Sequence, residues 1–213
     1  LHCHIGSQIF GAAGFAESAS RVIGLHARLL RDGEELTVNL GGGFGIAYTD
    51  ADEPTPIADL ADEIIAAVAE QCADRGIPVP PLAFEPGRAI VGRAGVTLYE
   101  VGTVKPVAVG DDLERVYVSV DGGMSDNARP ALYGAAYSAR LASRRSDAAP
   151  ALARVVGKHC EAGDIVVDAE WLPGDVTAGD LLAVPATGAY CFSLSSTYNY
   201  VPRPPVIAVG DGA

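Results

Sequence analysis

The chain has 213 residues, of which 49% are hydrophobic, and its formal net charge of -12 comes from 27 acidic against 15 basic residues. This balance excludes the basic surface that binding to nucleic acid or to an anionic membrane requires, so we expect a small-molecule partner. We find neither a run of about 20 apolar residues nor a signal-peptide pattern, which predicts a cytoplasmic protein. The four cysteines are widely spaced with no CxxC pair, so neither a disulfide framework nor a cysteine-type zinc site is expected.

The first half of the chain alternates short apolar runs with helical stripes. Residues 1–5, 36–40 and 82–85 are typical of buried strands, and residues 15–30 and 57–72 lie between them with helical spacing. The stripes consist of Val22, Leu25 and Leu29, and of Ile57, Leu60, Ile64, Val68 and Cys72. Strands that alternate with long helices predict parallel βαβ units, either in an open sheet or in part of a (β/α)8 barrel.

The second half of the chain changes to a period of two from Val96 onward. Two runs show this alternation: Tyr99, Val101 and Thr103 with Leu98, Glu100 and Gly102, and Val116, Val118 and Val120 with Tyr117, Ser119 and Asp121. This pattern predicts mostly antiparallel β structure, with a short helical insert within residues 130–141. Because the chain starts at a leucine inside an apolar run and stops soon after another, we expect both ends to have been cut from something longer.

Each of the three predicted parallel strands runs at its carboxyl end into a polar or glycine-rich loop. The loops are residues 4–8 (His-Ile-Gly-Ser-Gln), 41–45 (Gly-Gly-Gly-Phe-Gly) and 85–88 (Glu-Pro-Gly-Arg). Loops at this edge of a parallel sheet build the site, so the three should meet at one ligand. The glycine run lets backbone N–H groups approach an anion such as a phosphate, and Ser7 and Arg88 can add donors to it.

Two residues of these loops suit a heterocyclic ligand. Glu85 can pair with a protonated ring nitrogen, and His4 can stack on an aromatic ring. Plainer readings stand beside these: a tight turn for the glycine run, a hydrogen-bonded core histidine for His4, and a local salt bridge between Glu85 and Arg88. His2 and His4 also form the H-x-H pair that barrel metallohydrolases use, although the sequence offers few further ligands.

Seven motifs, in order along nearly the whole chain, carry a resemblance to a known family. They are His2-Cys3-His4-Ile5-Gly6-Ser7-Gln8, Asn39-Leu40-Gly41-Gly42-Gly43-Phe44-Gly45, Glu85-Pro86-Gly87-Arg88, Val120-Asp121-Gly122-Gly123-Met124, Arg129 with Tyr133-Gly134, Gly157-Lys158-His159-Cys160-Glu161 and Gly188-Ala189-Tyr190-Cys191. In these motifs the chain resembles the diaminopimelate decarboxylases, members of the alanine-racemase-like class of pyridoxal-phosphate enzymes. We therefore expect pyridoxal 5'-phosphate as cofactor and decarboxylation of meso-2,6-diaminopimelate to L-lysine and CO2, as part of lysine biosynthesis.

The resemblance assigns roles around the cofactor. It implies that His4 stacks on the cofactor ring, a part in catalysis as well as in binding. It implies that Glu85 pairs with the pyridine nitrogen. The remaining cofactor-binding residues that it implies are Ser7, Gly42, Gly43, Pro86, Gly87, Arg88 and Tyr190, of which Ser7, the two glycines and Tyr190 hold the phosphate.

It also assigns the amino-acid substrate. Cys160 is implied as the proton donor and Glu161 as the group that reads the far ammonium, both supplied to the partner subunit's site in a homodimer. The implied substrate-binding residues are Arg88, Arg129, Tyr133, Glu161 and Tyr190, with the two arginines binding carboxylate. Glu161 favours diaminopimelate over ornithine, because similar polyamine-forming enzymes carry aspartate there.

Two features depart from the family pattern. Ala162 stands where the family usually has serine, and the only lysines, Lys105 and Lys158, lie outside the motif of the lysine that binds the cofactor covalently. We therefore expect this chain alone to be inactive. The resemblance implies the second half of a (β/α)8 barrel over residues 1–95 and a mostly antiparallel, barrel-like β domain over 96–213 that is incomplete at its C-terminus. An ornithine- or arginine-type decarboxylase, or an inactive cofactor-binding homologue, remains the alternative.

Overall fold

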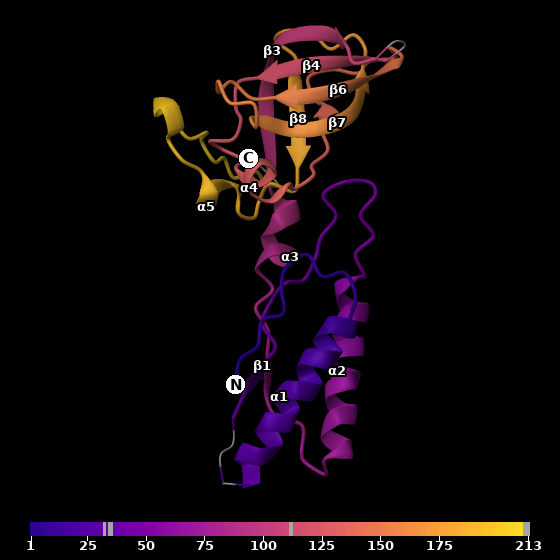
Figure 1. The fold of residues 1–213 in the computed structure, drawn as a ribbon, viewed down its shortest axis with the longest axis vertical. Coiled ribbons are helices and arrows are strands. Elements are labelled where there is room, and N and C mark those ends of the chain that lie inside the picture. Colours follow the sequence, from indigo (N-terminus) through magenta and orange to yellow (C-terminus); the bar gives the residue numbers. More distant parts are fainter. Residues whose placement is uncertain (32, 34–35, 111–112, 211–213) are drawn as a thin grey trace. The chain divides into compact units, whose positions relative to one another are not determined.

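The computed structural model describes residues 1–31, 33, 36–110 and 113–210. The chain divides into two compact units, Leu1–Gly92 and Arg93–Ala213 (Figure 1). Each unit has its own buried core. Among the described residues, no helix combines the length and the apolar character that a membrane crossing requires.

Three parallel segments form the framework of the first unit. β1 (Val38–Asn39) pairs with β2 (Leu82–Ala83) on one side, and on the other a single parallel bridge joins Asn39 to His2. The expected strand at residues 1–5 is therefore wrong in extent, because pairing is limited to that bridge. The backbone still runs parallel there, since the Cys3 N–H donates to the Asn39 oxygen at 2.9 Å.

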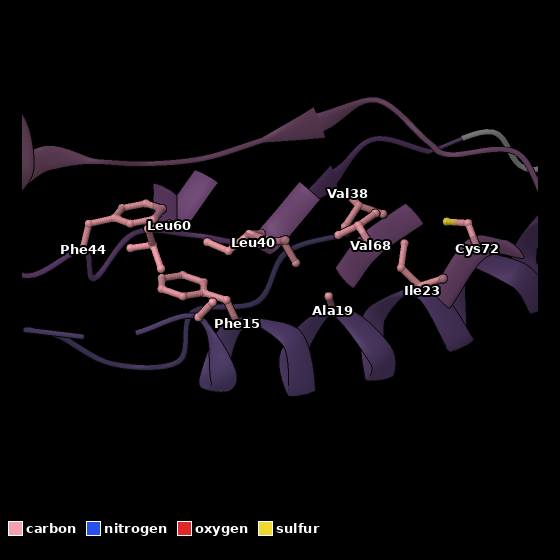
Figure 2. Close-up of a cluster of buried hydrophobic side chains, with 11 residues drawn as sticks. Phe15, Ala19, Ile23, Val38, Leu40, Phe44, Leu60, Val68 and Cys72 are labelled. Carbon is pink, nitrogen blue, oxygen red and sulfur yellow. The ribbon is translucent and has the colours of Figure 1, made fainter. Parts of the chain in front are cut away.

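Two long helices, α1 (Ala13–Arg31) and α2 (Ile57–Asp74), lie side by side and cover the framework. Figure 2 shows Phe15, Ala19 and Ile23 of α1 meeting side chains of β1 and α2. The cluster as a whole comprises Ala12, Phe15, Ala19, Ile23, Val38, Leu40, Phe44, Leu60, Ile64, Val68 and Cys72. The Phe15 and Phe44 rings stack with centroids 4.9 Å apart, which closes one end of this core.

The helix boundaries agree with the expected segments, but the buried face of α1 does not. Its buried row is Phe15, Ala19, Ile23 and Ala27. Of the predicted stripe, Val22 packs against the edge of this core, whereas Leu25 is 38% exposed. The row contains two alanines, which let the helix approach its neighbours closely but carry little hydrophobic signal in the sequence.

The predicted stripe of α2 is confirmed for four of its five members. Leu60, Ile64, Val68 and Cys72 are buried, while Ile57, the first residue of the helix, is 55% exposed. Pro56 lies at the N-cap.

A six-stranded sheet forms the core of the second unit, with strand order β5-β8-β3-β4-β6-β7. Its strands are β3 (Val96–Ala108), β4 (Glu114–Val120), β5 (Arg140–Leu141), β6 (Pro150–Val156), β7 (Ile165–Pro173) and β8 (Leu181–Pro185). Every pairing is antiparallel except that of β4 with β6, which is parallel. The sheet is therefore mostly antiparallel, as expected, but mixed.

The sheet curls until its two edges approach each other. β3 is long enough to pair with β8 through its first half and with β4 through its second, and the pairing with β4 shifts register between Val101 and Val104. At the far edges, the N–H of Ala139, next to β5, donates to the Glu170 carboxylate of β7 at 3.1 Å. The sheet is thus nearly closed.

Short helices complete the two units. They are α3 (Gly87–Val91), α4 (Arg129–Tyr133), α5 (Cys191–Leu194) and the 3-10 turns Gly92–Ala94 and Tyr198–Tyr200. The helix expected within residues 130–141 is only α4, which ends at Gly134 in the left-handed conformation with φ of 61°.

Candidate functional site

The three loops at the strand ends lie together in the first unit. The Glu85 N–H donates to the Gly41 oxygen at 2.9 Å, which joins the third loop to the second. Ile9 joins the first loop to the second, because its N–H donates to the Gly43 oxygen at 2.9 Å and its oxygen accepts from Gly45 at 2.9 Å. Main-chain hydrogen bonds therefore tie the three loops to one another.

Gly42 and Gly43 leave no space for side chains. A Cβ on Gly42 would lie 2.3 Å from the Glu85 carbonyl oxygen, and one on Gly43 would lie 2.3 Å from that of Gly6. Gly43 also has a φ of +98°, which disfavours any other residue. The loop backbones thus form a tight cradle of the kind that suits an anion.

His4 lies against this cradle. Its Nδ1 accepts a hydrogen bond from the Gly42 N–H at 3.3 Å, so the neutral ring carries its proton on Nε2. The side chain is exposed rather than part of the core. An imidazole held at one edge and open to solvent can stack on a planar ligand.

Arg88 is buried, with 8% of its surface exposed, and its guanidinium holds two hydroxyl groups. One nitrogen donates to Ser7 Oγ at 2.6 Å and another donates to the Tyr48 hydroxyl. Ser7, a predicted phosphate ligand, is therefore oriented by Arg88, a residue 81 positions later in the chain. This arrangement brings positive charge close to the glycine cradle.

Glu85 is oriented by its neighbours at the strand ends. Asn39 Nδ2 donates to its Oε1 at 2.8 Å, and His2 Nε2 lies 3.6 Å from the same oxygen. Pro86 and Gly87 form the turn that follows, in which the Gly87 N–H donates to the backbone carbonyl oxygen of Glu85 at 2.9 Å. Helix α3 begins at Gly87. The carboxylate stands at the same edge of the sheet as the cradle.

Cys160 and Glu161 lie on an exposed loop of the second unit. The Tyr198 hydroxyl donates to Glu161 Oε1 at 2.5 Å, and this bond, together with the negative charge of Glu161, raises the pKa of Tyr198. The Tyr198 ring also contacts His159, with centroids 5.3 Å apart. The 3-10 turn near the C-terminus thus supports the loop that carries the thiol.

The buried carboxylate of Asp164 also stabilises the loop that carries Cys160. It accepts hydrogen bonds from the Met124 N–H at 2.6 Å and the His159 N–H at 2.7 Å. A Cβ on Gly123 or Gly157 would lie 2.5 Å or 2.2 Å from its oxygens, so both glycines are required for this packing. Asp164 therefore ties the turn at residues 122–124 to the loop at residues 157–160.

Arg129, a predicted carboxylate ligand, is 5% exposed and belongs to a buried polar cluster. It donates to the Tyr137 hydroxyl, which lies 3.5 Å from the Cys191 sulfur, and that sulfur lies 3.5 Å from Asn127 Oδ1. Burial raises the pKa of both the Tyr137 phenol and the Cys191 thiol, so both are protonated at neutral pH.

The two predicted tyrosines of the second unit are accessible. Tyr133, at the end of α4, is 67% exposed, and Tyr190, at the N-cap of α5, is 45% exposed. Tyr190 has a φ of 67°, uncommon for a residue with a large side chain. Backbone strain of this kind concentrates at functional positions.

Sequence reasoning assigned no role to four residues that organise the site. Asn39 had a usable signal, an amide at a strand end directly before the glycine run. Asp164 had a weaker one, because Gly163-Asp164 follows the Cys160-Glu161 pair. Tyr48 and Tyr198 had none, since their partners lie 40 and 37 positions away in the chain.

The metal alternative gains no support. Within the part of the chain that the structure describes, no group of three or more histidine, cysteine, aspartate or glutamate side chains is arranged to hold a metal ion. Of the H-x-H pair, His2 lies near Glu85 and His4 contacts Gly42.

Comparison with known proteins identifies relatives of the whole chain. Residues 1–92 match the family model described as the pyridoxal-binding domain of pyridoxal-dependent decarboxylases. Diaminopimelate decarboxylase of Mycobacterium tuberculosis is 56% identical over 218 aligned residues, which cover all of this chain and 49% of that protein. The Bacillus subtilis enzyme of the same name is 46% identical over 215 residues, all of this chain and 48% of that protein. The chain spans about half the length of the curated relatives it matches.

Solved structures agree with these relatives. Diaminopimelate decarboxylase from M. jannaschii in complex with L-lysine superposes with a TM-score of 0.85 at 34% identity, over 95% of this chain and 45% of that one. The Helicobacter pylori enzyme, also complexed with L-lysine, superposes with a TM-score of 0.79 at 30% identity, over 95% and 47%. A lysine/ornithine decarboxylase from Vibrio vulnificus shares the fold at 22% identity. By sequence and by fold, the chain is homologous to diaminopimelate decarboxylases over its whole length, and its residues 1–92 belong to the pyridoxal-binding domain family of pyridoxal-dependent decarboxylases.

Proposed function

We propose that this chain is the C-terminal part of a longer enzyme, hereafter the full-length protein, that decarboxylates meso-2,6-diaminopimelate to L-lysine and CO2 with pyridoxal 5'-phosphate. The observation that carries the proposal is the meeting of three loops in the first unit. A glycine cradle that a single Cβ would fill lies beside a serine held by a buried arginine and beside a glutamate. These residues fit a phosphate group attached to a basic heterocycle.

Each residue of the first unit has a defined task in this proposal. Gly42 and Gly43 offer backbone to the phosphate, and Ser7 offers a hydroxyl that Arg88 orients; the family resemblance adds Tyr190 as a further phosphate ligand. Glu85 keeps the ring nitrogen protonated, and His4 stacks on the ring. Pyridoxal phosphate, when bound there, supplies an electron sink for the electron pair left when CO2 departs.

The second unit supplies the proton and reads the substrate. Cys160 delivers a proton to the carbon that loses CO2, and its exposed position makes it accessible to a second subunit. Glu161 pairs with the far ammonium, with its orientation set by Tyr198. Arg129 and Tyr133 serve the substrate's carboxylates, a task that Arg88 of the first unit shares in this proposal.

The proposal extends to architecture and assembly. Residues 1–95 correspond to the second half of a (β/α)8 barrel and residues 96–213 to a separate β domain. The full-length protein is a cytoplasmic homodimer in which Cys160 and Glu161 serve the partner subunit's site.

The test measures CO2 release and product formation by the full-length protein with pyridoxal phosphate. Meso-diaminopimelate, ornithine, arginine and lysine are supplied in parallel. We expect the highest kcat/KM with diaminopimelate, since Glu161 matches its far ammonium. Faster release from ornithine or arginine would reassign the substrate, and cofactor binding without any release would indicate an inactive homologue.

A variant separates the substrate assignment from cofactor binding. Glu161→Asp retracts the carboxylate by one methylene, so kcat/KM for diaminopimelate should fall by about ten-fold or more, the cost of a lost charge-assisted bond. The cofactor's absorbance spectrum should stay unchanged. An unaltered kcat/KM would remove Glu161 as the group that binds the ammonium.

A further inference from the structure

We infer that Asn39 is a positioning residue whose side-chain amide locks the glycine loop and Glu85 into one unit, so that Glu85 meets the cofactor's ring nitrogen in a fixed orientation. This inference rests on the proposed function and deepens it.

The position of Asn39 is set by its backbone. Asn39 ends β1, the central one of the three parallel segments. Its N–H donates to the Leu1 oxygen at 2.7 Å, and its oxygen accepts from the Cys3 N–H at 2.9 Å. On its other side, Asn39 is paired in register with Ala83. The Asn39 side chain therefore starts from a backbone that cannot shift without breaking the sheet.

The side-chain amide makes two hydrogen bonds in different loops. Oδ1 accepts from the Gly41 N–H at 2.8 Å, and Nδ2 donates to Glu85 Oε1 at 2.8 Å. The first bond holds the start of the glycine loop, where Gly41 has a φ of +73°. The second reaches 46 positions along the chain to the carboxylate. One planar group thus fixes the distance between the phosphate cradle and Glu85.

Of the three side chains of this shape, asparagine, aspartate and leucine, only the amide satisfies both partners. A backbone N–H can only donate and an ionised carboxylate can only accept, so the side chain between Gly41 and Glu85 must offer an acceptor and a donor together. Aspartate would keep the acceptor, lose the donor and place a second negative charge beside Glu85. Leucine, of similar shape, would lose both bonds.

The bonds to Glu85 also leave one of its oxygens for the ligand. Asn39 Nδ2 contacts Oε1, and His2 Nε2 lies 3.6 Å from the same atom. Among the described residues, no hydrogen bond to Oε2 is present. A carboxylate held through one oxygen presents the other to a ring N–H without having to reorient when the ligand binds.

The experiment uses the full-length protein stripped of cofactor, with pyridoxal phosphate and inorganic phosphate as probes. Asn39→Asp should weaken pyridoxal phosphate by about ten-fold to hundred-fold, the range for a lost hydrogen bond to a charged group. Competition by inorganic phosphate, which needs only the cradle, should change less than about two-fold because the bond to Gly41 is kept. Asn39→Leu should weaken the binding of both pyridoxal phosphate and inorganic phosphate.

Two further measurements distinguish positioning from general damage. In cofactor labelled with 15N at the ring, the nitrogen resonance should move in Asn39→Asp, because Glu85 no longer faces it in the same way. A double-mutant cycle should show that Asn39→Asp causes no further loss of affinity once Glu85→Ala is present. Gln71→Glu on α2, the same amide-to-acid change beside Arg75, is the control for added charge. It should leave the affinity for pyridoxal phosphate and the nitrogen resonance as in the unmodified protein.

The outcomes separate this inference from the proposed function. If the unmodified protein binds cofactor but Asn39→Asp leaves affinity and resonance unchanged, or loses as much affinity in the Glu85→Ala background as alone, Asn39 does not act through Glu85. If the unmodified protein fails to bind pyridoxal phosphate at all, the proposed function itself is wrong.

Discussion

Replacing Gly42 by alanine tests the cradle most directly. The added Cβ would lie 2.3 Å from the Glu85 carbonyl oxygen and 3.2 Å from its carbon. Ordinary contacts begin near 3.4 Å, so the two loops must separate by about 1 Å. The obstructing atoms belong to the Glu85 backbone, which cannot rotate away as a side chain could. The backbone of Gly42 is not in the left-handed region, so the contact alone accounts for the cost.

The expected magnitude follows from that displacement. Overpacking of this size costs about 1–3 kcal/mol of stability. A shift of about 1 Å between cradle and carboxylate should weaken pyridoxal phosphate by about hundred-fold in the full-length protein. Equilibrium titration of cofactor absorbance and a thermal melt measure the two quantities.

Gly11→Ala is the matched control, because a Cβ there has no heavy atom within 4 Å and the backbone is unstrained. It should melt within about 0.5 kcal/mol of the unmodified protein and bind cofactor equally well. An unchanged cofactor affinity in Gly42→Ala would refute the close approach of the two loops. Equal losses of affinity and stability in Gly11→Ala would show that the effect does not come from that approach.

Three further predictions concern other parts of the chain. Cys160→Ala in the full-length protein should slow turnover by about a hundred-fold or more with an unchanged cofactor spectrum, and normal turnover would exclude the thiol as proton donor. The pKa of Asp180 is lowered to about 2, chiefly by its hydrogen bonds with Arg144. The ionised carboxylate therefore contributes stability that is fully present above pH 3.8 and is lost as the pH falls through 2. The difference in melting temperature between the unmodified protein and Asp180→Asn should narrow between pH 4 and 2. Phe15→Ala should cost about 3–5 kcal/mol in urea unfolding while Arg21→Ala, at an exposed ion pair, changes it by less than about 0.5, and similar costs for the two would contradict the core assignment.

The loops of the first unit were predictable because parallel strands impose a common direction. Once residues 36–40 and 82–85 are recognised as parallel strands, their carboxyl ends must share an edge, and Gly42 and Glu85 must stand at that edge. The sequence contained no comparable rule for Tyr48 or Tyr198, whose contacts depend on the path of the chain between distant positions. Long-range side-chain pairs of this kind follow from the folded structure rather than from local pattern.

The helices show the same division. The α2 stripe was read correctly because Leu60, Ile64 and Val68 are large and regularly spaced. In α1 the row that packs is diluted by Ala19 and Ala27, while Leu25 suggested the neighbouring face. Hydrophobicity locates a helix well, but the face that packs is also chosen by how closely a small residue lets two backbones approach.

The buried carboxylate of Asp164 has a consequence for anyone who wishes to transplant the Cys160-Glu161 pair. Its oxygens occupy the space that side chains at Gly123 and Gly157 would need, and its bonds reach residues 40 positions earlier and 5 positions earlier in the chain. The dipeptide is therefore not a portable motif. A scaffold that received the dipeptide without Asp164, Gly123 and Gly157 would carry the thiol on a loop of a different shape. If either glycine were replaced by a larger residue, Asp164 would have to be replaced as well.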